Sequence, residues 1–272
     1  MSIVFGGDFH MIKALATDLD GTLLRDHKIP SYNQKAIMEL KESGNLFIIS
    51  TGRPYNGVKP LIEEYNLDVD YSVMLNGALI IDGDNKVIKH QCIPFTTIRE
   101  IITSLEYSQP SVSIETGYIT YLLDSLANNL PYDNKVEVDS IDEIKDKDLS
   151  LLSLYFEDAT TLDIDRICCE INKRFSLDCV AYRNTQYIDV VPVGCSKGNA
   201  VKFICEKENV KGEDIYTIGD SFNDISMFNI TDNSFTFTEC EDSLKEHVGY
   251  VVDSVAECIT NHLLIDSSVP TV

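Results

Sequence analysis

The sequence predicts an α/β protein: a core with a parallel sheet, and a second unit of mixed α+β character inserted into it. Short apolar runs alternate with amphipathic stretches in the first part of the chain, and the last third repeats this alternation. Strands that alternate with helices favour a parallel sheet. Between about residues 93 and 190 the pattern changes to strand-like runs with two helix-like segments. The length, 272 residues, allows one large domain or two smaller ones.

In the first part of the chain, apolar periodicity and turn residues define the expected elements. Ser31 and Gln34 match a capping box at the start of a helix, and Gly44 follows the end of that helix. Gly83 and Asn85 mark a hairpin turn. The expected order is strand 12–17, helix 31–43, strand 46–50, helix 54–65, strand 71–81 and strand 86–93.

The rest of the chain follows the same logic. Asn184-Thr185 is a candidate hairpin turn, and Ser196 is expected to cap a helix. The expected elements are helix 96–107, strand 150–156, helix 161–175, strands 179–183 and 186–191, helix 196–208, strand 215–218, helix 223–229, strand 234–237, helix 242–247, strand 250–252 and a helix after 254. We therefore predict a core domain of residues 11–92 and 189–272, and an inserted domain of residues 93–188. Residues 1–10 are a candidate N-terminal extension, because a clean strand pattern opens at Met11.

Composition excludes several classes of function. The chain carries 44 acidic and 22 basic residues, a net charge of −22, which argues against binding to nucleic acid or to an anionic membrane surface. It holds no apolar run long enough to span a bilayer. Eight cysteines without a CxxC pattern favour buried thiols in a reducing compartment, so we expect a cytoplasmic protein.

Two carboxylates follow the first buried strand directly, in Asp18-Leu19-Asp20-Gly21-Thr22. Open α/β folds bind ligands at the carboxyl ends of their strands, so both side chains are candidates for one cleft. Gly21 allows a sharp turn there. The second apolar run ends in Ser50-Thr51-Gly52-Arg53, where a hydroxyl and a guanidinium suit a phosphoryl oxygen; a plain loop with a surface arginine is the alternative.

Three further motifs carry polar groups at the edges of expected elements. Asn76-Gly77-Ala78 is either a bulge in a strand or an amide presented to a ligand. Lys197, in Ser196-Lys197-Gly198, stands at a helix N-terminus, where its charge opposes the helix dipole; an anionic partner would explain it, and an exposed lysine is the alternative. Gly219-Asp220-Ser221-Phe222-Asn223-Asp224 follows a strand and offers hard oxygen ligands that suit Mg²⁺.

These motifs, in this order, resemble those of the haloacid dehalogenase-like (HAD) superfamily, and together they look like its Cof-type branch. The resemblance covers residues 11 to 265 and shows no departure at a signature position. It implies a Rossmann-like parallel-sheet core with an inserted α+β cap of type IIB (C2B) between the second and third motifs. The cap segment matches only in size, position and coarse pattern.

The resemblance also implies a division of labour among the catalytic residues. Asp18 would attack phosphorus and form an aspartyl-phosphate, and Asp20 would protonate the leaving alkoxide and then activate water. Mg²⁺ would be held by Asp18, by Asp220 and by the backbone carbonyl of Asp20. Asp224 would support the water shell of the metal or the lysine.

The phosphoryl group would be bound by a second set of residues. Thr51 and Lys197 would hold its oxygens, and Asn223 would donate a hydrogen bond nearby. Gly52, Arg53 and Asn76 are further expected members of this set. The expected function is a Mg²⁺-dependent phosphatase of small phosphorylated metabolites, such as sugar phosphates or phosphorylated cofactors, acting as a monomer or weak dimer. The alternatives are a phosphosugar mutase on the same scaffold and a non-catalytic sensor of phosphorylated ligands.

Overall fold

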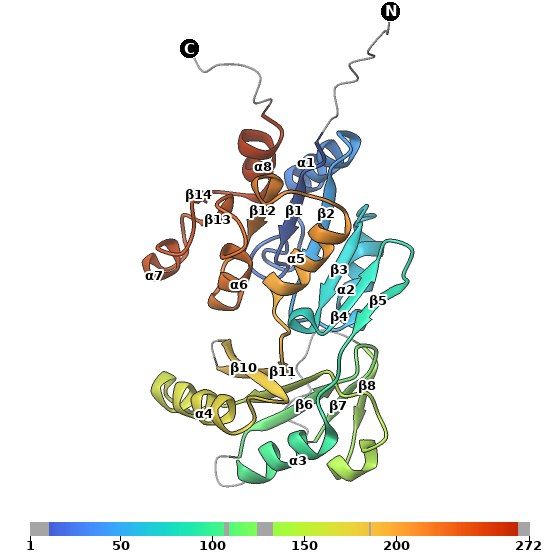
Figure 1. The fold of residues 1–272 in the computed structure, drawn as a ribbon, viewed down its shortest axis with the longest axis vertical. Helices are drawn as coiled ribbons and strands as arrows, with labels where there is room; N and C mark the ends of the chain where they lie inside the picture. Colours follow the sequence, from blue (N-terminus) through green and yellow to red (C-terminus); the bar gives the residue numbers. More distant parts are fainter. Residues whose placement is uncertain (1–10, 106–108, 124–132, 185, 266–272) are drawn as a thin grey trace, which may run out of the picture.

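The computed structural model describes residues 11–105, 109–123, 133–184 and 186–265. Within these residues the chain forms two sheets, one in each half of the molecule (Figure 1). The candidate N-terminal extension, residues 1–10, lies outside the described part, and so does Thr185 of the expected hairpin turn.

The first sheet has the order β14-β13-β12-β1-β2-β3-β4-β5. Its first six strands in this order are parallel, as the alternating pattern predicts, and β4 and β5 complete an antiparallel edge. The strands are β1 (Ala14–Thr17), β2 (Leu46–Ser50), β3 (Tyr71–Met74), β4 (Leu79–Asp82), β5 (Val87–His90), β12 (Ile215–Ile218), β13 (Ser234–Phe237) and β14 (Tyr250–Val252).

Helices cover both faces of this sheet. Successive side chains of a strand point to opposite faces, and both sets are apolar here, so each face has to be buried. Leu15 of β1 packs in an apolar cluster with residues of α1 and α8, whereas Ala14 and Ala16 pack in another with residues of α5 and α6 (Figure 1). The helices of the core are α1 (Ser31–Glu42), α2 (Tyr55–Glu64), α5 (Lys197–Lys207), α6 (Ile225–Phe228), α7 (Asp242–Lys245) and α8 (Val255–Cys258), with short 3₁₀ turns η1 (Leu75–Gly77), η4 (Gly212–Asp214) and η5 (Phe222–Asp224) and a π-helical turn η6 (Ile259–Leu263).

The second sheet lies between β5 and α5 in the chain and has the order β10-β11-β9-β6-β7-β8. Only the β7–β8 pair is parallel among its described pairs. Its strands are β6 (Ser111–Glu115), β7 (Thr120–Leu122), β8 (Lys135–Glu137), β9 (Leu151–Tyr155), β10 (Cys179–Asn184) and β11 (Tyr187–Pro192), accompanied by α3 (Phe95–Ser104), α4 (Thr161–Arg174) and η3 (Ile141–Ile144). This mixed α+β unit agrees with the expected fold class.

One face of the second sheet is apolar and carries the two helices. Val112 and Ile114 of β6 pack in one cluster with residues of α3 and α4. Because side chains alternate along a strand, Ser113 and Glu115 point to the opposite face. That face lies toward the first sheet: Leu151 and Val191 pack there against the core, and the polar side chains Ser113, Glu115, Ser153 and Asp189 line the cavity beside them.

Three expectations about local structure are wrong. The run 71–81 is not one strand: η1 interrupts it, and β3 and β4 are antiparallel. Helix α1 has Pro30 at its N-cap without a side-chain hydrogen bond, and the Gln34 amide donates instead to the carbonyl of Ile29, so there is no capping box. All eight cysteines are free thiols, but Cys92 and Cys169 are exposed and not buried.

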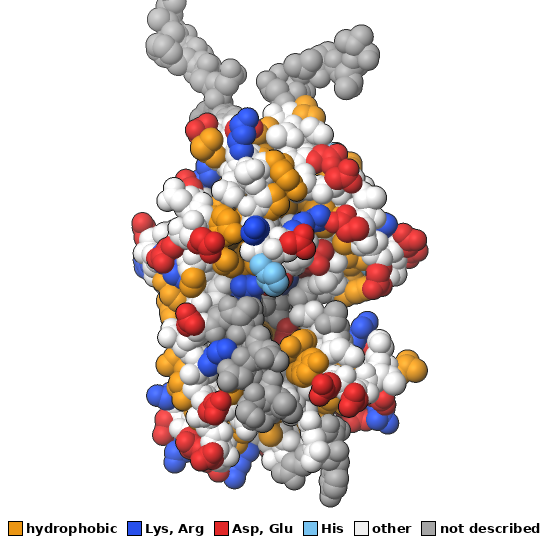
Figure 2. Space-filling view, turned by 180° about the vertical axis from the view of Figure 1, so that it is seen from behind, with side chains coloured by type: hydrophobic (Ala, Val, Ile, Leu, Met, Phe, Trp, Pro, Cys, Tyr) orange, Lys and Arg blue, Asp and Glu red, His pale blue; other side chains and the backbone are white. Residues whose placement is uncertain are grey.

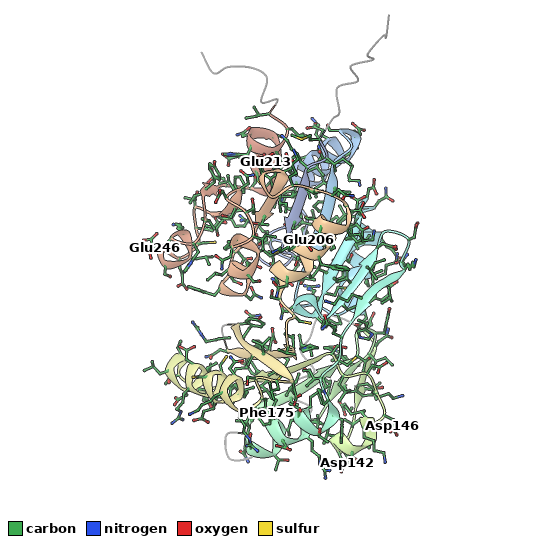
Figure 3. The ribbon with its side chains drawn as sticks, viewed as in Figure 1. Asp142, Asp146, Phe175, Glu206, Glu213 and Glu246 are labelled. Carbon is green, nitrogen blue, oxygen red and sulfur yellow. The ribbon has the colours of Figure 1, made fainter. Side chains whose placement is uncertain are left out.

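Acidic side chains are spread over the surface and interspersed with Lys and Arg on the face shown in Figure 2. Five exposed carboxylates labelled in Figure 3 come from different helices and turns of both halves of the molecule: Asp142, Asp146, Glu206, Glu213 and Glu246. The acidic side chains are therefore not gathered in one patch on the face that Figure 2 shows. In the described part of the chain, no helix has the length and apolar character that a membrane span needs.

Candidate active site

Asp18 stands at the carboxyl edge of the first sheet. It directly follows β1, and its backbone N–H donates to the carbonyl of Ile218 at the end of β12, 2.9 Å away. The side chain is only 5% exposed. Burial raises the pKa of Asp18 well above its usual value; the ammonium of Lys197 opposes that rise, whereas the charges of two neighbouring carboxylates add to it.

Lys197 is the central cation of the site. It is the first residue of α5 and is 2% exposed, so the alternative of an exposed surface lysine is wrong. Its Nζ donates to Oδ1 of Asp18 at 2.6 Å and to Oδ1 of Asp224 at 2.7 Å. Burial by itself would lower the pKa of Lys197, but the two carboxylates outweigh burial and raise it, so the side chain stays charged.

The start of α5 is packed so closely that its second residue has to be glycine. A Cβ on Gly198 would lie 1.8 Å from the carbonyl oxygen of Ser226 in α6, a distance that no side chain can occupy. The Ser196 hydroxyl accepts a hydrogen bond from the N–H of Asn199 at 3.0 Å and caps the helix, as expected. Together these contacts fix the position from which Lys197 enters the site.

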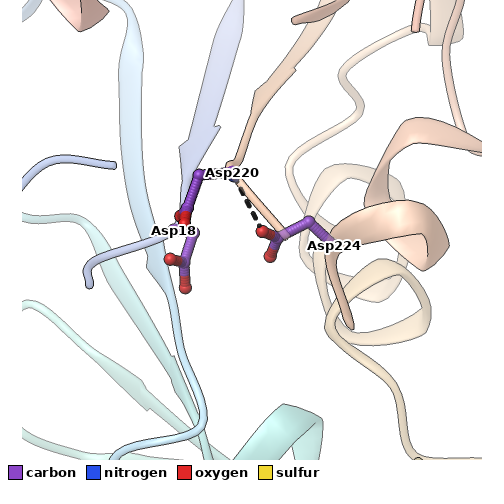
Figure 4. Close-up of side chains that lie close together, drawn as sticks. All are labelled: Asp18, Asp220 and Asp224. Atoms are coloured by element: carbon purple, nitrogen blue, oxygen red, sulfur yellow. Dashed lines mark hydrogen bonds between the residues drawn. The ribbon is translucent and has the colours of Figure 1, made fainter. Parts of the chain in front are cut away.

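Asp224 organises the loop that follows β12. It is wholly buried, and its Oδ2 accepts hydrogen bonds from the backbone N–H groups of Asp220 and Ser221, each at 3.1 Å. Figure 4 shows the first of these bonds and the proximity of the three aspartates. With Lys197 on its other oxygen, Asp224 already accepts three hydrogen bonds, so its contacts are those of a residue that orients others.

Asp220 is oriented by a residue of the first motif. The Thr22 hydroxyl donates to its Oδ1 at 2.6 Å. Burial raises the pKa of Asp220, the Thr22 bond opposes this, and the charge of Asp224 adds to it. Gly21, with a φ of +77°, turns the chain so closely past Asp220 that a Cβ there would lie 2.4 Å from Oδ2. The first and last motifs are therefore packed against each other.

The donor set of this cluster fits a hard divalent cation. One oxygen from each of Asp18, Asp220 and Asp224 can be chosen so that all three lie within 4.8 Å of one another. Lys197 bonds to two of the three carboxylates, and burial together with neighbouring carboxylates raises the pKa of Asp18 and of Asp220, so a cation between them would stabilise their ionised forms. Carboxylate oxygens are ligands that suit Mg²⁺. Because the oxygens of Asp224 are already engaged, Asp18 and Asp220 are the better candidates for direct ligands.

Asp20 and Arg53 form an ion pair at the mouth of the cavity. Arg53 donates from Nε to Oδ2 of Asp20 at 2.7 Å and from Nη2 to Oδ1 at 2.5 Å. A third bond runs from Nη1 to the carbonyl of Gly57 at 3.2 Å. The guanidinium expected to face a phosphoryl group thus faces the expected general acid, and the Asp20 side chain contacts Arg53 and not the other aspartates.

The loop of Thr51 is held by the turn between β3 and β4. The Asn76 N–H donates to the carbonyl of Thr51 at 3.0 Å, and the Leu75 N–H donates to the carbonyl of Arg53 at 3.1 Å. Asn76 has a φ of +50°, in the left-handed region that Asn tolerates better than most residues. Its Nδ2 donates to Oδ2 of Asp189 at 3.2 Å. Asn76 therefore braces the loop with its backbone and contacts the second sheet with its side chain.

Most of the expected site residues meet in one cavity of about 490 Å³. Asp224 and Asn76 do not line it but contact residues that do. The expected residues that line it are Asp18, Asp20, Thr51, Gly52, Arg53, Lys197, Asp220 and Asn223.

Sequence reasoning missed the side of this cavity that the second sheet contributes. That side includes Ser113, Glu115, Ser153, Tyr187 and Asp189. A signal for Asp189 was present, because an aspartate interrupts an apolar run just before the Lys197 motif. The others come from strands whose pairing is not visible in the sequence.

The chain is similar to known proteins over nearly its whole length. A family model described as haloacid dehalogenase-like hydrolase matches residues 15–259. The chain is 27% identical to the 5-amino-6-(5-phospho-D-ribitylamino)uracil phosphatase of Bacillus subtilis, with 90% of this chain and 92% of the relative covered. It is 24% identical to the pyridoxal phosphate phosphatase of Escherichia coli, with 93% and 99% covered. A solved subclass IIB sugar phosphatase of the HAD superfamily superposes with a TM-score of 0.77 at 21% identity, with 92% and 98% covered.

The first prediction concerns the buried ammonium. Replacing Lys197→Met leaves Asp18 and Asp224 buried without their cation, and breaking a buried ion pair typically costs about 3–5 kcal/mol of unfolding free energy. Raising the pH should enlarge this loss of unfolding free energy. The folded-state pKa of Asp18 is already raised and should rise further without the lysine. A carboxyl group whose pKa is higher in the folded state than in the unfolded state makes the protein less stable as the pH rises through the folded-state pKa. Urea unfolding in EDTA at several pH values measures this.

The matched control is Lys202→Met, on the same helix but exposed. It removes the same charge and should change the unfolding free energy by less than about 0.5 kcal/mol. Equal losses in the two variants would show that the buried contacts of Lys197 do not stabilise the fold.

Proposed function

The chain belongs to the haloacid dehalogenase-like hydrolases and is a phosphatase, and we propose that it cleaves small phosphate monoesters with Mg²⁺ and through a phosphorylated Asp18. The observation that carries the proposal is the Lys197 ammonium, which contacts Asp18 and Asp224 in the cluster that also contains Asp220. This contact supports the proposal because it groups a carboxylate suited to attack phosphorus, a cation suited to bind phosphoryl oxygens and carboxylates suited to bind a metal.

Phosphate monoesters are dianions, so the site has to orient the attacking group and offset charge on the phosphoryl oxygens. In the proposed first step an oxygen of Asp18 forms a bond to phosphorus while the ester P–O bond breaks. Lys197 and Thr51 bind the phosphoryl oxygens. Mg²⁺, held by Asp18 and Asp220, would supply charge neutralisation when bound. Water then attacks phosphorus, releasing inorganic phosphate and restoring Asp18.

Asp20 is the proposed proton carrier for both steps. It would donate a proton to the leaving alkoxide and then take one from the attacking water. Its carboxylate accepts two hydrogen bonds from Arg53, so it has to exchange this partner for the substrate. Asp20 is about half exposed, which leaves room for that exchange. Once Asp20 moves away, the guanidinium of Arg53 would be free to contact the phosphoryl group.

We propose that the inserted unit, predicted as residues 93–188 and continued by β11 of the second sheet as far as Pro192, is the cap of this enzyme, and that residues 11–92 and those after Pro192 are its core. The two units touch on both sides of the cavity: the Tyr55 N–H donates to the carbonyl of Gly117 at 2.8 Å, and Asn76 bonds to Asp189. A cap in this position would exclude water during phosphoryl transfer and select the leaving group. The chain enters the cap near Ile93 and leaves it near Pro192, where we expect the hinges.

We also place the enzyme in a reducing compartment such as the cytoplasm. Its eight cysteines are free thiols, and two of them, Cys92 and Cys169, are exposed. Exposed thiols persist where disulfide formation is disfavoured.

Metal dependence is the second prediction. Chelation should abolish release of inorganic phosphate, and Mg²⁺ should restore it, because the buried carboxylates near Asp18 need a divalent counter-charge. The measurement is the rate of phosphate release from a hexose phosphate with EDTA and after addition of Mg²⁺. Full activity in metal-free buffer would contradict it, and conversion to an isomer without release of phosphate would identify a mutase instead.

The third prediction concerns Asp20. Asp20→Asn cannot transfer the proton, a role typically worth about 10²–10⁴ in rate. A nitrophenolate leaves without protonation, whereas a sugar hydroxyl with its high pKa does not. The phosphorylation step of the variant should therefore slow much more with a sugar phosphate than with nitrophenyl phosphate. Rapid-quench measurement of alcohol release on both substrates tests this, and equal losses would remove Asp20 from the role of general acid.

A further inference from the structure

On the cavity side of the second sheet, the pairing of neighbouring strands places polar residues side by side in a row. Ser113 of β6 is paired with Ser153 of β9, and Ser153 is paired with Asp189 of β11. All three line the cavity, and Glu115 lies two residues beyond Ser113 on the same face of β6. Directly paired side chains on one face are neighbours, so these residues form a continuous surface opposite Asp18. We call Ser113, Glu115, Ser153 and Asp189 the cap wall.

The cap wall carries two buried carboxylates. Glu115 is 2% exposed and Asp189 is 7% exposed. Oδ1 of Asp189 accepts from the Ser153 hydroxyl at 2.9 Å and Oδ2 accepts from Asn76, while Oε2 of Glu115 accepts from the Thr120 hydroxyl at 2.8 Å. These bonds hold each carboxyl group in place, so the wall presents oriented acidic oxygens; burial raises the pKa of Asp189, and the bonds from Ser153 and Asn76 oppose that rise.

The two cations that line the cavity belong to the core, and the charge of Lys197 also reaches Asp189, whose pKa it lowers against the larger effect of burial. Lys197 and Arg53 come from the core and contact the aspartates there. Among the described residues, no Lys, Arg or His of the second sheet lines the cavity. The residues in the internal gaps, 106–108, 124–132 and 185, contain none of these three types either. The core side of the cavity can therefore bind a phosphoryl dianion, whereas the described residues of the second sheet offer no cation for a second anion.

We propose that Glu115 and Asp189 determine which leaving groups this enzyme accepts: those that present hydroxyl or amine hydrogen-bond donors, and not those that carry a second phosphate or a carboxylate. The inference rests on the proposed function, because it assumes that the phosphoryl group lies beside Asp18. A buried carboxylate accepts hydrogen bonds from donors, and it repels an anion strongly because water is largely excluded. Such rejection of unwanted ligands by like charge is a common source of specificity.

The wall is connected to the phosphoryl end of the cavity through Asn76. Its side chain bonds to Asp189, and its backbone N–H bonds to the carbonyl of Thr51. Asp189 and the proposed phosphate-binding loop are thus joined through one residue. A leaving group that fits the wall is therefore held in a fixed relation to the phosphoryl group, so we expect selection to act on kcat/KM.

The test uses two substrates with the same six-carbon chain. Sorbitol 6-phosphate ends in a hydroxymethyl group, and 6-phosphogluconate ends in a carboxylate. The wild-type enzyme with Mg²⁺ should prefer the polyol by at least about tenfold in kcat/KM, which corresponds to about 1.4 kcal/mol. Glu115→Gln keeps the shape and removes the charge, and should narrow this ratio several-fold.

The control variant is Glu137→Gln, which removes the same charge from an exposed position on β8 of the same sheet and should leave the ratio unchanged. Circular dichroism verifies folding, and Asp189→Asn replaces Glu115→Gln if the latter does not fold. A wild-type ratio near one, or a preference for the carboxylate, would overturn the inference, as would a folded Glu115→Gln with the wild-type ratio. Absence of Mg²⁺-dependent hydrolysis with both substrates and with nitrophenyl phosphate would instead refute the proposed function.

Discussion

The ammonium of Lys197 is the group on which the rest of this site depends. A buried charge is tolerated only when it is paired and hydrogen-bonded, and Lys197 is paired with Asp18 and Asp224. These contacts bring together the end of β1, the start of α5 and the loop after β12, three segments far apart in the chain. The parallel sheet makes this possible because its strand ends meet at one edge. Because Gly198 has no side chain, the start of α5 can pack directly against the backbone of α6 at Ser226, which fixes where Lys197 enters the site.

The two sheets contribute residues of different character to the cavity: the basic residues that line it come from the core, and the second sheet adds acidic ones. The core supplies Lys197 and Arg53, whereas the second sheet supplies Glu115 and Asp189. Alternation along β6 explains how one short strand serves both packing and chemistry: Val112 and Ile114 face the helices, and Ser113 and Glu115 face the cavity. The charge pattern within the cavity, and not the net charge of the chain, is therefore what bears on substrate selection.

Much of the core was predictable because its signals are local. Two carboxylates directly after a buried strand, at Asp18 and Asp20, and a lysine at a helix N-terminus are each unusual enough to indicate a site. The structure brings both features together in one cavity. The sequence pattern leaves Asn76-Gly77 open between a bulge and an amide presented to a ligand; the structure has a turn between two antiparallel strands there, for which Asn-Gly is typical. The pairing of Arg53 with Asp20 and the cap wall could not be predicted, because they depend on how loops and strands from distant parts of the chain meet.

The central claim is that Asp18 is the nucleophile that accepts the phosphoryl group from the substrate. The most direct measurement is an acid quench of the Mg²⁺-loaded enzyme during turnover of a radiolabelled phosphate ester, followed by peptide mapping. The account predicts an acyl phosphate, stable in acid and labile in base, on the peptide that contains Asp18, and no label in the Asp18→Asn variant. Label on another residue, or an Asp18→Asn enzyme that still becomes labelled and turns over, would contradict it.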